Sequence, residues 1–217
     1  MIVFALFVLC AMYLSSMVFH WNGVELNVLV RDPAAQFGIP IYAGFFSWLG
    51  VFALVATTAV LAMCASVATR GRRPMIVAAI LTAALALDDS FMFHDAVWSE
   101  RWGYSELLIY GFYGLMVLLL GVMLSAEPPS TGASGLLVPA AFLVGSAAID
   151  ATFLSEALGW RAIWVEDALK MTGFASWLFY WFSAARAYVR ASEPAAADRD
   201  KPTFAMREGS AGTVARS

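Results

Sequence analysis

The sequence predicts an all-α integral membrane protein, a bundle of six transmembrane helices with both termini in the cytoplasm. Of its 217 residues, 61% are hydrophobic and only 13% are charged, whereas soluble domains are about half apolar and about a quarter charged. Six apolar segments reach the length of about 20 residues that crosses the hydrocarbon core. Helices are expected because lipid offers backbone polar groups no other partner except a closed barrel, whose strands are much shorter.

The six predicted spans are separated by residues that interrupt helices. Gly38 and Pro40 precede or open the second span, and Pro74 lies near the start of the third. Ser105 is expected to cap the fourth span, because a serine hydroxyl accepts a backbone N–H at a helix start. A Pro-Pro loop over 127–132 separates the fourth span from the fifth. The spans are Met1–Phe19, Pro40–Thr69, Pro74–Val97, Ser105–Ser125, Leu136–Ser155 and Ile163–Val189.

The chain is predicted to consist of one folded domain and a tail. Residues 1–191 contain all six spans and are expected to form the transmembrane domain. Residues 192–217 are rich in alanine, proline and charge and have little apolar surface to bury. A disordered cytoplasmic tail is therefore expected there.

The arginines predict the orientation, because cytoplasmic loops carry an excess of lysine and arginine. Arg70, Arg72 and Arg73 lie between the second and third spans, and Arg186 and Arg190 close the sixth. These ends are expected in the cytoplasm, with the protein in a bacterial inner membrane. The net charge of -3 and the lack of a basic patch exclude nucleic acid as a partner.

Ionisable residues gather at the opposite, extracytoplasmic ends of the spans. Charges at membrane depth cost at least a few kcal/mol, so such residues indicate a functional site. Asp95, Glu106, Glu156 and Asp167 are expected at helix ends, where water or headgroups solvate them. The six that need a functional explanation are Asp88, Asp89, His94, Asp150, Glu166 and Lys170.

Helical spacing predicts how the groups of the third span share faces. At about 100° per residue, Asp88 and Asp95 fall on one line of an unbroken helix, and Ser90 and His94 fall on another. The wide polar sector that results is unsuited to a surface that faces lipid. The same reasoning groups Glu106 with Tyr110 and Tyr113 on the fourth span.

The fifth and sixth spans supply the remaining groups. Asp150 is interpreted as an acid of the functional site, and the alternative is a structural role such as a hydrogen bond across helices to Ser90 or Tyr113. Glu166 and Lys170 are four residues apart, with the acid first, which favours an ion pair within the helix. Lys170 is also expected to neutralise a carboxylate from the third or fifth span.

Three stretches carry a resemblance to a group of bacterial multi-pass membrane proteins. They are Leu-Asp-Asp-Ser-Phe-Met-Phe-His-Asp over 87–95, Ser146 with Asp150, and Glu-Asp-Ala-Leu-Lys-Met-Thr-Gly over 166–173. This group is marked by a DDxFxxH[DE] helix and an E[DE]xxKxxG helix. The resemblance implies that these positions form one constellation, and it implies no activity.

The function predicted first is metal-dependent hydrolysis of a lipid or another amphiphile. One histidine among carboxylates suits a hard or borderline divalent ion, which can activate a bound water. Ser90, His94 and Asp95 loosely resemble part of the alkaline ceramidase site, without its further histidines. The predicted metal ligands are His94, Asp89 and Asp150, and the predicted catalytic groups are Glu166, Lys170 and Asp88.

Three other functions stay open. Carboxylates and a histidine in a membrane also mark ion- or proton-handling transporters. A structural or assembly subunit would use the acids to bond its helices to one another, to a second copy or to another membrane protein. The stretch over 166–174 also resembles the retinal-binding helix of microbial rhodopsins. That resemblance implies that Lys170 forms a Schiff base with retinal. Membrane lipids are expected partners in every case.

Overall fold

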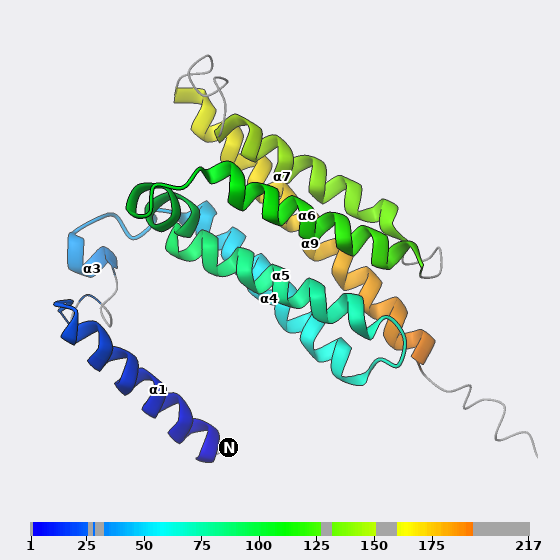
Figure 1. Ribbon diagram of the computed structural model, residues 1–217, viewed down its shortest axis with the longest axis horizontal. Coiled ribbons are helices and arrows are strands. Elements are labelled where there is room, and N and C mark those ends of the chain that lie inside the picture. Colours follow the sequence, from blue (N-terminus) through cyan, green and yellow to red (C-terminus); the bar gives the residue numbers. More distant parts are fainter. Residues whose placement is uncertain (1, 26–27, 29–32, 127–131, 151–159, 193–217) are drawn as a thin grey trace, which may run out of the picture. The chain divides into compact units, whose positions relative to one another are not determined.

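The computed structural model describes residues 2–25, 28, 33–126, 132–150 and 160–192, and all the regular structure in these ranges is helical. The chain divides into two compact units, 1–46 and 47–217. The first unit holds α1 (Ile2–Trp21) and the short α3 (Pro33–Phe37). The α1 helix agrees with the first predicted span, while α3 was not predicted (Figure 1).

The second unit contains the long helices that carry the ionisable residues (Figure 1). Four stretches, Phe45–Val67, Arg72–Phe91, Glu106–Ser125 and Ala133–Asp150, are long and apolar enough to cross a membrane. The chain is therefore a membrane protein, and four of the six predicted spans are supported by length and composition. The elements in order are α4 (Phe45–Val67), α5 (Arg72–Phe91), η1 (Phe93–Arg101), α6 (Glu106–Ser125), η3 (Ala133–Leu136), α7 (Leu137–Asp150) and α9 (Trp160–Ser192).

The prediction of one unbroken helix over Pro74–Val97 is wrong. The α5 helix ends at Phe91, Met92 adopts a left-handed conformation with φ 48°, and a π-helical segment, η1, follows. The N–H of Met92 donates to the carbonyl of Asp88, and the N–H of His94 donates to the Asp88 carboxylate. The side chain of Asp88 thus satisfies one backbone N–H, that of His94, which the broken helix leaves open.

The other predicted helix ends agree with the structure only in part. Ser105 caps α6, and its hydroxyl accepts the N–H of Leu107. The second span starts at Phe45 rather than Pro40, because turns occupy 41–44. The predicted loop at 127–132, the end of the fifth span and the tail lie largely or wholly outside the described residues.

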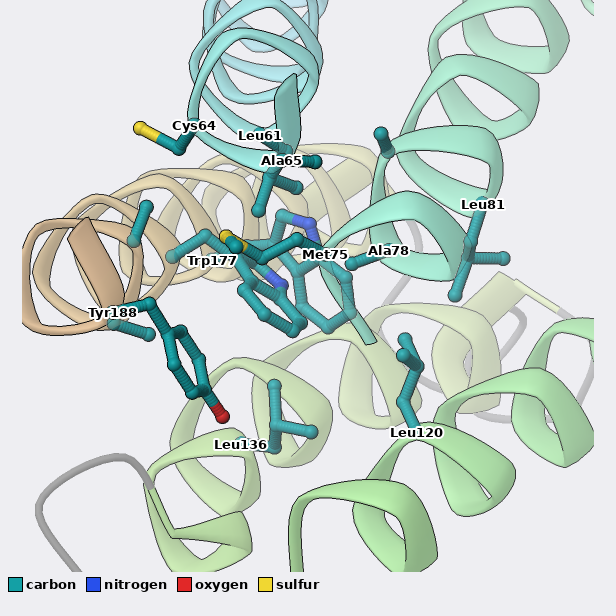
Figure 2. Close-up of a cluster of buried hydrophobic side chains, with 14 of the residues drawn as sticks. Leu61, Cys64, Ala65, Met75, Ala78, Leu81, Leu120, Leu136, Trp177 and Tyr188 are labelled. Atoms are coloured by element: carbon teal, nitrogen blue, oxygen red, sulfur yellow. The ribbon is translucent and has the colours of Figure 1, made fainter. Parts of the chain in front are cut away.

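The core of the second unit is an apolar layer in which α9 contacts α4, α5, α6 and η3 (Figure 2). Trp177 and Trp181 are fully buried, and their rings lie 5.9 Å apart. The indole N–H of Trp177 donates to the Thr82 hydroxyl of α5 at 2.9 Å. This bond satisfies a polar group that would otherwise be costly to bury.

The α4–α5 turn packs against the last turns of α9. Gly71 has φ 66°, and a Cβ built on it would lie 2.2 Å from the Tyr188 ring. The N–H groups of Thr69 and Arg70 both donate to the hydroxyl of Ser192. Gly71 is therefore required both by its backbone conformation and by the close approach of Tyr188.

We expect Gly71→Ala to destabilise the protein by about 2 kcal/mol or more, because it combines about 1 kcal/mol of left-handed strain with the clash against Tyr188. Gly103→Ala is the matched control. Gly103 has φ 70°, but nothing lies within 4 Å of its built Cβ, so this variant reports strain alone. Equal unfolding free energies for the two variants, measured in detergent, would contradict the packing role of Gly71.

Candidate functional site

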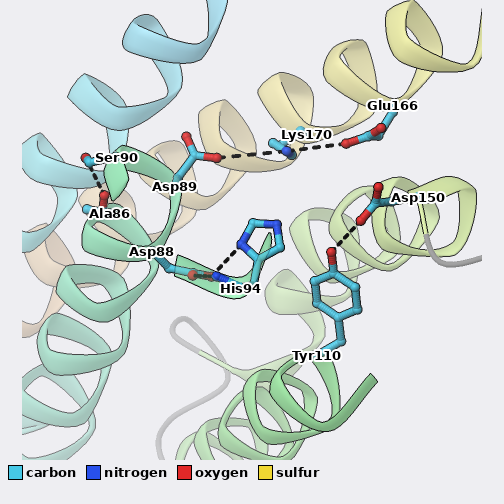
Figure 3. A network of polar contacts seen from close by, with 9 residues as sticks. All are labelled: Ala86, Asp88, Asp89, Ser90, His94, Tyr110, Asp150, Glu166 and Lys170. Atoms are coloured by element: carbon cyan, nitrogen blue, oxygen red, sulfur yellow. Dashed lines mark hydrogen bonds and ion pairs between the residues drawn. The ribbon is translucent and has the colours of Figure 1, made fainter. Parts of the chain in front are cut away.

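A set of polar side chains lies where α5 ends, α6 begins, α7 ends and α9 begins. These ends come together because each helix runs opposite to the one before it in the pairs α5–α6 and α7–α9 (Figure 1). We call this set the polar cluster (Figure 3), and its members are Asp88, Asp89, His94, Tyr110, Asp150, Glu166 and Lys170.

Asp88 holds His94 by two contacts. Its Oδ1 accepts the His94 backbone N–H at 2.8 Å, and its Oδ2 lies 3.2 Å from His94 Nδ1. Figure 3 shows both contacts made by the same carboxylate, and the left-handed Met92 lies between the two residues in the chain. The Asp88 side chain is only 8% exposed. A carboxylate beside one imidazole nitrogen fixes the orientation of the ring.

Lys170 joins α5 to α9. Its Nζ lies 3.4 Å from Glu166 Oε1 and 3.9 Å from Asp89 Oδ1 (Figure 3). The predicted ion pair within the helix is therefore confirmed, and the carboxylate that Lys170 meets on another helix is Asp89. The ion pair between Lys170 and Asp89 thus links the sixth predicted span to the third.

Asp150 accepts a hydrogen bond from Tyr110 at 2.5 Å, which links α7 to α6. The predicted partners, Ser90 and Tyr113, are wrong. The Ser90 hydroxyl donates to the carbonyl of Ala86 in its own helix, and Tyr113 interacts with Asp88. Helical spacing placed Tyr110 only on one face with Glu106 and Tyr113. No local pattern could pair it with Asp150, 40 residues away.

The three groups of contacts adjoin one another. The rings of His94 and Tyr110 are 5.6 Å apart, so the Asp88–His94 pair lies next to the Tyr110–Asp150 pair. Glu166 is close enough to Asp150 for their charges to interact, and Asp89 likewise interacts with His94. The six residues singled out in the sequence thus lie in one region, with Tyr110 as a seventh member.

Acidic groups outnumber basic groups in the polar cluster. It holds four carboxyl groups, from Asp88, Asp89, Asp150 and Glu166, against the ammonium group of Lys170 and the imidazole of His94. One carboxylate oxygen, Oδ2 of Asp89, is buried and has no hydrogen-bond partner among the described residues. Uncompensated charge in such surroundings costs several kcal/mol. The cluster is therefore suited to take up positive charge.

The predicted metal site is not assembled in the described part of the chain. Within those ranges, no three His, Cys, Asp or Glu residues form a group that could hold a metal ion. His94, Asp89 and Asp150 instead have different partners: Asp88, Lys170 and Tyr110 respectively. The reason is the helix break, which turns His94 onto Asp88.

The four acids that were expected at helix ends are not members of the polar cluster. Asp167 is exposed, and Glu106 is half-buried in the first turn of α6, where the helix dipole favours a negative charge. Asp95 belongs to η1, so the straight line through Asp88 that the sequence predicted does not exist. Glu156 lies outside the described residues.

An aromatic group flanks the cluster on η1 and the turn that follows it. The indole N–H of Trp98 donates to the carbonyl of Ser105, and the Trp98 ring lies 5.9 Å from Trp102 and 5.0 Å from Tyr104. Trp102 and Tyr104 are about half exposed. Aromatic residues of this kind are typical of the boundary between lipid and water, which agrees with a cluster close to one membrane surface.

Comparison with known proteins finds one family. The model of the family described as "Domain of unknown function (DUF8692)" matches residues 1–184 of the chain. The matched residues include every described helix except the part of α9 that follows residue 184. They include the whole polar cluster. No curated protein and no solved structure matches the chain.

Proposed function

We propose that this chain, which belongs to the family described as Domain of unknown function (DUF8692), is an ion-handling membrane protein. Its polar cluster takes up protons or a small monovalent cation from one side of the membrane. The observation that carries the proposal is the excess of carboxyl groups over basic groups within the cluster. Buried acids of this kind in membrane proteins mark ion and proton sites.

Asp89 and its neighbours support uptake at a defined place. Asp89 is 88% buried, as its side chain retains only 12% exposure, and one of its oxygens lacks a hydrogen-bond partner in the described chain. Such an oxygen is stabilised when it carries a proton or meets a cation. Lys170 Nζ lies 3.9 Å from Asp89 Oδ1, so the protein already places one positive charge beside this carboxylate. An incoming cation would have to share the carboxylates of the cluster with Lys170.

The site is proposed to open to one surface only. Beyond the cluster, the core towards the other end of the bundle is built from apolar side chains such as Leu54, Met75 and Leu120. No chain of acids continues through the described residues of that core. The static structure thus supports binding from one side, and transport would need a second conformation.

The test is cation-induced proton release by the purified, full-length protein. In a weakly buffered solution with a pH dye, addition of Na⁺, K⁺ or Li⁺ is expected to release protons from the wild type, and Asp150→Asn should lose most of the signal. Asp167→Asn is the matched control, since Asp167 is exposed on the same helix as Glu166. Reconstitution into vesicles under an ion or pH gradient then separates binding from transport. A wild type that releases no protons and moves no ion would contradict the proposal.

We also propose the finer topology, six spans with both termini in the cytoplasm of a bacterial inner membrane. The α9 helix has 33 residues, about 50 Å at 1.5 Å per residue, and the 20-residue α1 is strongly apolar. The arginines of the α4–α5 turn share an end of the bundle with Ser192, near Arg186 and Arg190. Reporter fusions at both termini test this orientation.

Metal-dependent hydrolysis of a lipid or amphiphile remains a second proposal. It is supported by the Asp88–His94 pair, because a carboxylate that orients a histidine occurs both in metal sites and in general bases. The roles proposed earlier for Glu166, Lys170 and Asp88 belong to it. Metal analysis of purified wild type and His94→Ala tests it: absence of metal from both, with no effect of divalent ions on thermal stability, would exclude it.

A structural or assembly role is the third proposal. The contacts of Tyr110 with Asp150 and of Lys170 with Asp89 bond helices to one another, as such a subunit requires. It is distinguished by copurification of a stoichiometric partner, or of a second copy, in mild detergent. That result together with no ion response would favour it over the first proposal.

A further inference from the structure

The end of the bundle opposite the polar cluster carries exposed arginines that come from distant parts of the chain. Arg70, Arg72 and Arg73 belong to the α4–α5 turn and the start of α5, and Arg186 and Arg190 to the end of α9. The bonds from the Thr69 and Arg70 N–H groups to Ser192 hold these segments together. We call this group of five arginines the arginine end.

The positive charge of the arginine end is not compensated by the described residues. None of the five arginines forms an ion pair with a described residue. No Asp or Glu occurs at this end within 60–80, 118–126, 132–141 or 180–192. Exposed guanidinium groups that have no acidic neighbour in the described part of the chain are suited to bind phosphate groups, to which they donate paired hydrogen bonds.

Apolar surface lies directly beside these arginines on the membrane side. Ile76 and Ile80 follow Arg73 at helical spacing on α5 and are 41% and 66% exposed. Met63 and Val67, at the end of α4, are 67% and 63% exposed. A ligand that fits both features has an anionic phosphate head and an apolar chain.

We propose that the arginine end binds the headgroup of an anionic phospholipid, with the acyl chains along the exposed apolar faces of α4 and α5. The sequence showed no basic patch because its arginines are divided between two segments. Folding brings them to one end, where the membrane surface supplies the lipid phosphates. This inference does not depend on the function of the polar cluster.

The experiment compares lipid binding by the full-length protein and by the variant Arg70→Gln/Arg72→Gln/Arg73→Gln. Binding is measured in neutral detergent, by native mass spectrometry and by thermal unfolding. Phosphatidylglycerol, phosphatidylcholine of the same chain length and inorganic phosphate are added in separate arms. Arg101→Gln is the matched control, since Arg101 is exposed on η1 at the opposite end.

The wild type is expected to bind phosphatidylglycerol more tightly than phosphatidylcholine. The triple variant should lose about tenfold or more in apparent affinity, since each basic group at a membrane surface contributes about fivefold. Arg101→Gln should bind as the wild type does. Equal binding of the two lipids by the wild type, or unchanged phosphatidylglycerol binding by the triple variant, would overturn the proposal.

Two further arms keep the test decisive. Protection of the wild type by inorganic phosphate alone, to the same extent as by phosphatidylglycerol, would show a small-anion site and overturn the lipid assignment. If the triple variant does not fold, Arg73→Gln and a salt titration of the wild type replace it. Binding to a headgroup through exposed charges must then weaken as salt rises, and a salt-independent preference would count against it.

Discussion

Lys170→Met is expected to destabilise the folded protein by about 3 kcal/mol, because it leaves Asp89 and Glu166 without their positive partner. Removing one member of a buried ion pair typically costs about 3–5 kcal/mol. We expect the lower end of that range, since the Lys170 side chain keeps 28% exposure and Glu166 21%. The free energy of unfolding in mixed micelles, followed by circular dichroism, measures the loss.

A double-mutant cycle separates the charge effect from the loss of the lysine side chain. Asp89→Asn removes the α5 carboxylate that Lys170 of α9 contacts. Lys170→Met should therefore lower the free energy of unfolding less in the Asp89→Asn background than in the wild type. Arg101→Met, at an exposed position, should change stability by about 0.5 kcal/mol or less. Identical costs of Lys170→Met with and without Asp89 would show that the 3.9 Å contact contributes nothing.

Trp177→Ala is expected to cost about 3–5 kcal/mol, the range found when a buried aromatic side chain is truncated. Trp177 is fully buried where α9 meets α5, so its truncation leaves a cavity inside the core (Figure 2). The same substitution also removes the hydrogen bond to Thr82. Unfolding in mixed micelles again gives the measurement.

Two variants divide this cost into its parts. Trp177→Phe keeps one six-membered aromatic ring and loses the N–H that donates to Thr82, so it should cost about 1 kcal/mol for the hydrogen bond in addition to the cost of the lost ring volume. Phe179→Ala is the control, because Phe179 is 74% exposed on the same helix and lipid can replace its contacts. A cost for Trp177→Ala no greater than that for Phe179→Ala would refute the central packing role.

The parts of the site that were predictable depend on residues close together in the chain. The pair Glu166–Lys170 follows from helical spacing alone, and the cap at Ser105 from the residue type before a helical run. The helix break after Phe91 was not predictable in this way. Single-residue propensities favour continuation there, and only the bonds of His94 and Met92 to Asp88 show what stabilises the break.

For the contacts between helices, the sequence predicted the type of partner but not which residue it would be. The sequence indicated that Lys170 would meet an acid of another span, but not that the acid would be Asp89. It named the wrong partner for Asp150, because the rotation of α6 that presents Tyr110 depends on how the whole helix packs. The described residues do not assemble the predicted set of metal ligands, which required η1 and two helices, α5 and α7, to direct side chains to one point.

The residues and their spacing suffice to predict a helical membrane protein with its ionisable groups at one end of its helices. Composition and periodicity suffice for that, because lipid excludes other backbone arrangements and makes buried charge rare. The tertiary structure alone decided that Asp88 holds His94, that Lys170 joins Asp89 to Glu166, and that the separated arginines share one end. Those outcomes depend on helix rotation, packing and chain reversal, which local sequence spacing does not specify.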